Sequence, residues 1–257
     1  MLSVRQSKLI SFVVFNALGA VSFAQQSSRY TKNLIFKIEV PLKFKGRIIK
    51  GSLRQSEIID FLNLPVRNGD TDPAHKYGVN MTWSNHREKM VYTCNEWKKA
   101  RSEKAYARTT YDMAMESSLI YTCGLLFNLQ RARLSKKSFI SKVSLANLNL
   151  IPAEILGFIP QDKKEDKKES ERLQAKTISE VVPAKDIEKD GKNKLELSYG
   201  GLHQIFWEGA RADFNGDGVE DVLIFTADKA EGGTMGYAYY FILTRYSSSG
   251  PLKLISQ

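Results

Sequence analysis

The sequence contains only two cysteines and three histidines among its 257 residues. This is too few for a cysteine-rich zinc scaffold or for a small domain held together by several disulfides. Beyond the first 24 residues, no apolar run approaches the roughly 20 residues that a transmembrane helix needs. The motifs of nucleotide-binding loops, serine hydrolases, zinc proteases and thioredoxin-like enzymes are also absent. No enzyme class is therefore indicated by a motif.

The overall composition is that of an ordinary globular protein. Hydrophobic residues make up 42% of the chain, aromatic residues 11% and charged residues 26%. This balance excludes global disorder, since enough apolar side chains are present to form a core. The length is sufficient for one or two domains.

Residues 1–24 predict a secretory signal peptide. Arg5 and Lys8 form a short basic start, Leu9 to Phe23 is mostly apolar, and Ser22 and Ala24 supply the small residues of a cleavage site. The alternative is a membrane anchor that is never cleaved, for which the apolar run is short. We expect a periplasmic or secreted protein with no transmembrane segment after cleavage.

Positive charge is concentrated in the first half of the remaining chain. Between residues 25 and 150 there are 22 lysines and arginines against 10 acids. The segment Arg29 to Arg54 has eight basic residues and one acid, Glu39. A second cluster has no acid at all and consists of Arg131, Arg133, Lys136, Lys137 and Lys142.

Such surfaces attract polyanions. We expect the basic region to contact an anionic envelope polymer or a protein partner, and the alternative is a solvated basic face without a partner. Sequence-specific nucleic-acid binding is not expected, because no aromatic and basic recognition motif accompanies the charge.

Two helix starts are predicted around the cysteines. Thr93 and Glu96 have capping-box spacing, and Thr109 begins a similar pattern. A single helix over residues 94–123 would hold the cysteines about 43 Å apart, beyond the reach of a disulfide. Two helices, from Cys94 to about residue 106 and from residue 110 onward, bring Cys94 and Cys123 level when they fold back as an antiparallel hairpin. We predict a Cys94–Cys123 disulfide, and two buried free thiols are the alternative.

The C-terminal part predicts an antiparallel β meander. Five strand-like runs are separated by short turn-forming segments, at residues 195–199, 203–212, 222–227, 237–245 and 252–255. The predicted organisation is a basic α+β region at 25–160, a charged linker or exposed helix at 161–194, and an antiparallel β unit at 195–257. The fold class is therefore α+β, with the disulfide-linked helical hairpin and short strands in the N-terminal half.

The loop between the second and third of these runs predicts a calcium site. Oxygen side chains at positions 1, 3, 5 and 9 converge when the chain curls around an ion, the carbonyl at position 7 adds a ligand, and glycine at position 6 permits the sharp turn. The residues that match are Asp213, Asn215, Asp217, Asp221, the carbonyl of Val219, and Gly218. The alternative is a turn rich in Asp and Asn that holds its shape without metal.

Residues 211–226 resemble the calcium loop of FG-GAP or VCBS-type repeats, which have the pattern Asp-x-Asn-Gly-Asp-Gly-x-x-Asp. In that family the matching positions are metal ligands. The sequence has one copy, whereas a β-propeller needs repeated blades. The chain as a whole, with its stretches TTYDMAMES, ARADFNGDGVEDVL and GGTMGY, also resembles exported proteins of Gram-negative bacteria, which implies a compartment and no activity.

Two functions of different classes follow from these observations. The first is a non-enzymatic, calcium-binding protein with a binding or structural role at the cell envelope. The alternative is a hydrolase that acts on an envelope polymer, with carboxylates such as Glu208 and Glu220 as candidate acid/base groups. The second depends only on the presence of carboxylates.

Overall fold

A computed structural model describes residues 34–67, 77–160, 162–189, 193–233 and 236–255. The predicted signal peptide at residues 1–24 lies outside the described residues. Within the described part, no helix combines the length and the apolar character needed to span a membrane.

The described chain begins with an antiparallel hairpin of β1 (Ile35–Phe44) and β2 (Arg47–Arg54). Its pairing is regular except for a bulge between Ile38 and Leu42. Gly46 in the connecting turn has φ +74°, a conformation that side chains with a Cβ rarely adopt.

Short elements complete the N-terminal half. A 3-10 turn, η1 (Gln55–Glu57), leads into α1 (Ile58–Leu62). A three-stranded sheet has the order β4-β3-β5, with bounds β3 (Val79–Thr82), β4 (Glu88–Val91) and β5 (Tyr106–Ala107). Two longer helices are α2 (Cys94–Ser102) and α3 (Thr110–Arg131).

Both predicted helix starts are present. The Thr93 side chain accepts a hydrogen bond from the backbone amide of Glu96, and the Thr109 side chain accepts one from Asp112. The predicted disulfide is also present, with the Cα atoms of Cys94 and Cys123 5.1 Å apart and both cysteines buried. The connection between the helices differs from the simple turn that was predicted: α2 ends at Ser102, and β5 follows it.

The C-terminal half contains a six-stranded antiparallel sheet with the order β11-β10-β9-β8-β7-β6. This confirms the antiparallel character expected of the C-terminal region. Its bounds are β6 (Ile187–Lys189), β7 (Lys194–Tyr199), β8 (Leu202–Ala212), β9 (Asp221–Ala230), β10 (Gly236–Thr244) and β11 (Lys253–Leu254). Before the sheet come η3 (Ala153–Ile155), α4 (Lys163–Leu173), α5 (Ile178–Val181) and η4 (Ala184–Asp186).

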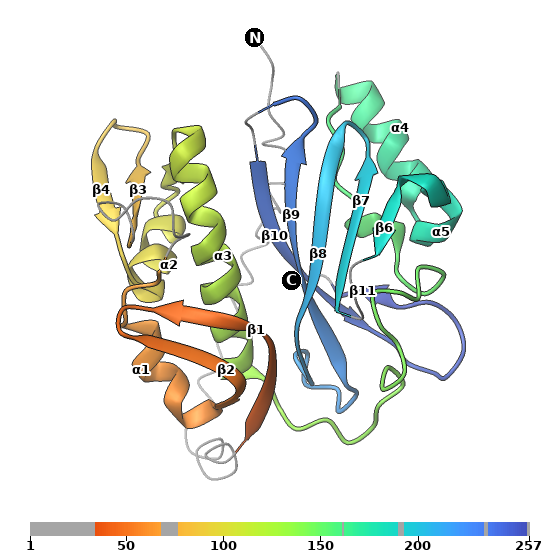
Figure 1. Cartoon of the computed structure of the whole chain (residues 1–257), viewed down its shortest axis with the longest axis horizontal. Helices are drawn as coiled ribbons and strands as arrows, with labels where there is room; N and C mark the ends of the chain where they lie inside the picture. Colours follow the sequence, from red (N-terminus) through yellow and green to blue (C-terminus); the bar gives the residue numbers. More distant parts are fainter. Residues whose placement is uncertain (1–33, 68–76, 161, 190–192, 234–235, 256–257) are drawn as a thin grey trace, which may run out of the picture.

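The sheet is covered on both faces (Figure 1). α3 lies on one side, and α4 and α5 lie on the other. Leu223 and Ile242 belong to the core that includes α3, whereas Val222, Ile224 and Leu243 belong to the core built with residues 140–182. Because both faces are covered, six consecutive residues at the start of β9 are buried, and this strand has no polar face there.

Candidate functional site

The predicted calcium loop connects β8 to β9. Asp213 directly follows β8, and Asp221 is the first residue of β9. Between them, Gly216 and Gly218 have φ values of +84° and +85°, so both lie in the left-handed region that favours glycine. The two glycines permit the tight turns with which the loop joins the antiparallel strands β8 and β9.

The two aspartates at the ends of the loop are buried and hold its shape. Asp213 accepts hydrogen bonds from the backbone amides of Gly216 (2.6 Å) and Gly218 (2.9 Å). Asp221 Oδ2 accepts one from the amide of Phe214 at 2.9 Å. Asp221 is 0% exposed, and its other oxygen, Oδ1, has no hydrogen-bond partner.

The other predicted ligands lie toward solvent. Asn215 and Asp217 are exposed, and their side chains hydrogen-bond each other at 2.8 Å. Asp217 Oδ1 also accepts a bond from the amide of Val219 at 2.7 Å. In this conformation, no three His, Cys, Asp or Glu side chains of the described residues are grouped so that they could hold a metal ion.

The electrostatics of Asp221 follow from its position. Burial raises the pKa of this carboxyl to about 6, because the charged form is poorly solvated. The Thr244 hydroxyl and the amides of Phe214 and Asn215 offset part of that rise in the pKa, whereas the charge of Asp217 adds to it. A buried carboxylate with a free oxygen is suited to a hard divalent cation, which prefers oxygen ligands and would supply the missing counter-charge.

A segment distant in sequence holds the loop from outside. The amide of Arg133 donates to the carbonyl of Asp213 at 2.8 Å, and the amide of Lys136 donates to that of Gly218 at 2.8 Å. A Cβ added at Gly216 would lie 3.4 Å from Arg133 Nη1, so the guanidinium runs beside the loop. The second basic cluster of the sequence is therefore partly a neighbour of the acidic loop. Sequence spacing carries no signal for this contact, because about 80 residues separate the two segments.

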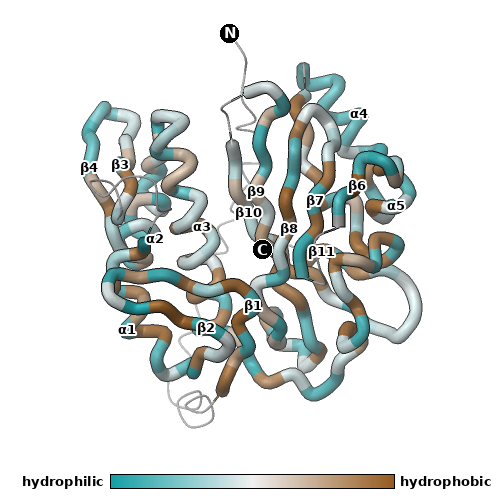
Figure 2. Tube along the Cα trace, in the orientation of Figure 1, coloured by the Kyte–Doolittle hydropathy of each residue, from teal (hydrophilic) through white to brown (hydrophobic). Residues whose placement is uncertain are grey.

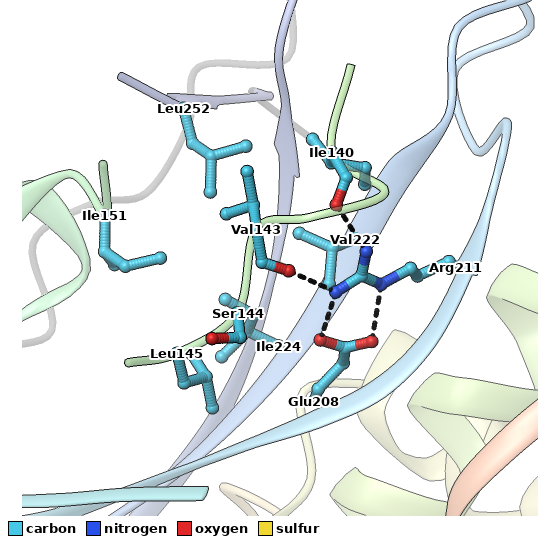
Figure 3. Close-up of a pocket in the computed structure, with 10 residues that line it drawn as sticks. All are labelled: Ile140, Val143, Ser144, Leu145, Ile151, Glu208, Arg211, Val222, Ile224 and Leu252. Atoms are coloured by element: carbon cyan, nitrogen blue, oxygen red, sulfur yellow. Dashed lines mark hydrogen bonds and ion pairs between the residues drawn. The ribbon is translucent and has the colours of Figure 1, made fainter. Parts of the chain in front are cut away.

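The two glutamates considered for a hydrolase are both engaged in other contacts. The Arg211 guanidinium binds both carboxylate oxygens of buried Glu208, at 2.6 and 2.8 Å (Figure 3). The adjoining cavity is only about 10 Å³, which is too small for a substrate. Glu220 accepts a hydrogen bond from the Ser138 hydroxyl at 2.6 Å. Glu208 is therefore an anchoring group in this structure, neither free nor accessible for proton transfer.

No protein-family model matches the chain, and no curated protein or solved structure matches it either. The resemblance to FG-GAP and VCBS-type loops consequently remains a prediction from residues 211–226.

A second buried carboxyl lies at the opposite end of β9. Asp228 accepts a hydrogen bond from the Thr226 hydroxyl at 2.7 Å. It pairs across the strands with Gln204, whose side-chain amide donates to the carbonyl of Gly157 at 2.9 Å. A Cβ at Gly157 would lie 2.4 Å from Asp228 Oδ2, so a larger residue there would require the buried carboxyl to move. Burial raises the pKa of Asp228 to about 6, and the Thr226 hydroxyl lowers it in part.

This raised pKa predicts a specific pH dependence of stability. Between the unfolded value of 3.8 and about 6, the folded chain binds more protons at Asp228 than the unfolded chain does, so stability falls as pH rises through this window. We expect Asp228→Asn to remove a decline of about 2 to 3 kcal/mol between pH 4 and pH 7. Urea unfolding with chelator present at both pH values measures it. The exposed control Asp60→Asn should keep the wild-type decline, and an unchanged slope in Asp228→Asn would contradict the assignment.

Proposed function

We propose that this chain is an exported, non-enzymatic calcium-binding protein with a binding or structural role at the cell envelope. Calcium would be held in the loop between β8 and β9 by Asp213, Asn215, Asp217, Asp221 and the carbonyl of Val219. The observation that carries this proposal is the fully buried carboxylate of Asp221, whose Oδ1 lacks a partner. A buried charge of this kind is costly unless a counter-charge meets it.

Two further observations support the proposal. The loop offers only oxygen ligands, which suits calcium better than zinc or copper. The Cys94–Cys123 disulfide is typical of proteins in oxidising compartments such as the periplasm or the extracellular space. In this proposal α2 and α3 act as a disulfide-linked helical hairpin, and the basic region contacts the envelope partner.

The role proposed for calcium is structural. The metal would tie the start of β9 to the end of β8 and, through the backbone contacts of Arg133 and Lys136, to the segment after α3. The positive charges of Arg133 and Lys136, which lie beside the loop, repel a bound calcium ion and weaken its binding. We therefore expect a dissociation constant in the millimolar range, as in other extracellular modules. A hydrolase is not proposed, because Arg211 neutralises Glu208.

The test is thermal unfolding of the chain from Gln25 to Gln257, which keeps every described residue. With 10 mM calcium and a dissociation constant of about 1 mM, we expect a gain of about 1.4 kcal/mol over the chelated protein. For a chain of this size that raises the unfolding midpoint by about 4 °C. Asp217→Ala should abolish the shift.

Glu231→Ala is the matched control, because it removes one exposed acid at the other end of the β9–β10 hairpin. This variant should show the same calcium-induced rise in the unfolding midpoint as the wild type. Sodium chloride of equal ionic strength should not raise the midpoint of the wild type. If calcium leaves the wild-type midpoint unchanged, or if Asp217→Ala keeps the shift, the loop is a turn that needs no metal.

A further inference from the structure

The outer face of the β1–β2 hairpin combines cations with exposed aliphatic side chains. Ile35 is directly opposite Arg54, and Lys43 is directly opposite Ile48, so each end of the hairpin pairs one isoleucine with one cation on the same face. Ile35 is 62% exposed and Ile48 is 50% exposed. The two isoleucines lie at opposite ends of the hairpin. Each can enter the acyl boundary of a lipid surface while the cation opposite it meets a headgroup.

The positive charge of this face is not neutralised by the protein. Glu39 is the single acid between Ile35 and Arg54, and it is occupied by the Lys37 ammonium and the Asn193 side-chain amide, each at 2.6 Å. Among the described residues, Lys43 and Lys50 have no acidic partner. Their charges therefore remain available to an external anion.

The β1–β2 hairpin is held in place by core packing and by hydrogen bonds to α3. Its inward side chains, among them Phe36, Ile49 and Leu53, are buried in the core that includes α3. Hydrophobic and hydrophilic residues are therefore interspersed along β1 and β2 (Figure 2). Directly after β2, the Gln55 side-chain amide donates to three carbonyls at the end of α3, those of Leu129, Gln130 and Ala132, at 3.0 to 3.1 Å. The outward side chains thus project from a hairpin that is attached to α3, the longest of the described helices.

We propose that this face docks on an anionic lipid surface, with Lys43 and Lys50 at the phosphates and Ile35 and Ile48 in the interface. The proposal names the partner class of the envelope role proposed above and depends on that role only for the compartment. A soluble polyanion would be attracted by the lysines alone and would leave the isoleucines in water. A lipid surface uses both, because cations meet the headgroups while aliphatic side chains enter the acyl boundary.

The test is co-sedimentation of the chain from Gln25 to Gln257 with vesicles of phosphatidylcholine containing about one third phosphatidylglycerol. We expect binding to these vesicles and none to pure phosphatidylcholine. Lys43→Ser/Lys50→Ser should weaken binding roughly 30-fold, at about fivefold for each cation near the surface. The control Lys163→Ser/Lys164→Ser removes the same charge from exposed positions on α4 and should bind as the wild type does.

A second pair of variants separates lipid from other polyanions. Ile35→Ser/Ile48→Ser should weaken vesicle binding at least tenfold without changing binding to soluble polyphosphate. The control Leu134→Ser alters an exposed aliphatic residue outside the hairpin and should change neither. Circular dichroism and the unfolding midpoint verify that each variant is folded.

Two outcomes would overturn the proposal. If Lys163→Ser/Lys164→Ser weakens vesicle binding as much as Lys43→Ser/Lys50→Ser does, the vesicles respond to the net charge of the protein and not to the hairpin face. If the isoleucine variant binds vesicles as the wild type does, the partner is a soluble polyanion and not a lipid surface. Asp217→Ala should bind vesicles normally, so failure of the calcium site and failure of this surface are distinguished by different measurements.

Discussion

Replacing Arg211 with methionine is expected to lower the free energy of unfolding by about 3 to 5 kcal/mol. The guanidinium binds both oxygens of buried Glu208 and also donates to the carbonyls of Ile140 and Val143, each at 2.6 Å. Without it, a carboxylate and two backbone carbonyls lose their partners away from water. Urea unfolding of the wild type and the variant, both with chelator, measures this loss.

Two variants test whether the loss comes from the unpaired charge. Glu208→Leu/Arg211→Met should be more stable than Arg211→Met alone, because the second change removes the stranded carboxylate. Arg172→Met breaks a more exposed ion pair with Glu169 at the same i,i+3 spacing and should cost about 1 kcal/mol or less. If Arg172→Met and Arg211→Met lower the free energy of unfolding equally, burial of the Glu208–Arg211 pair does not increase its contribution to stability.

Removing the disulfide is expected to cost about 3 to 4 kcal/mol. Cys94 and Cys123 are separated by 29 residues, and a crosslink over this distance restricts the unfolded chain by that amount in the loop-entropy model. The double variant Cys94→Ala/Cys123→Ala avoids a reactive single thiol. Its urea unfolding should coincide closely with that of the reduced wild type.

Reductant provides the control for this prediction. Dithiothreitol should destabilise the wild type and leave the double variant unchanged, because the variant has no other cysteine. If reductant has no effect on the wild type, the two sulfurs are not bonded in solution. A loss in the double variant would then come from the deleted side-chain volume at two buried positions.

Several elements were predictable because local chemistry decides them. Thr93 and Thr109 cap α2 and α3 because their side chains accept the amides of residues three positions later. The strands of the C-terminal sheet follow from β-branched and aromatic runs between turn residues. The disulfide followed from the two helix starts, since only a break between the helices permits the cysteines to meet.

Other elements were not predictable from local patterns. The segment at residues 161–194 was expected to be a linker or an exposed helix; it contains α4, whose charged residues are compatible with both. β6 is only three residues long, and its pairing with β7 makes it a strand. The strand β5 occupies the connection where a turn was predicted, because pairing with Thr82 of β3 extends Tyr106.

The helix caps, most of the strands, the cysteine pair and the spacing of oxygen side chains in the loop were predictable because each depends on local residue patterns. Which charges are buried, and which groups they contact, depends on how distant segments pack. Asp221 is buried because both faces of the sheet are covered, and Arg133 reaches the loop only because α3 ends beside it. Glu208 was considered as an acid or base of a hydrolase, but in the structure it accepts hydrogen bonds from Arg211. The same guanidinium also donates to two carbonyls about 70 residues away in the sequence. Burial and long-range pairing are properties of the packed chain, so no spacing of residues contains them.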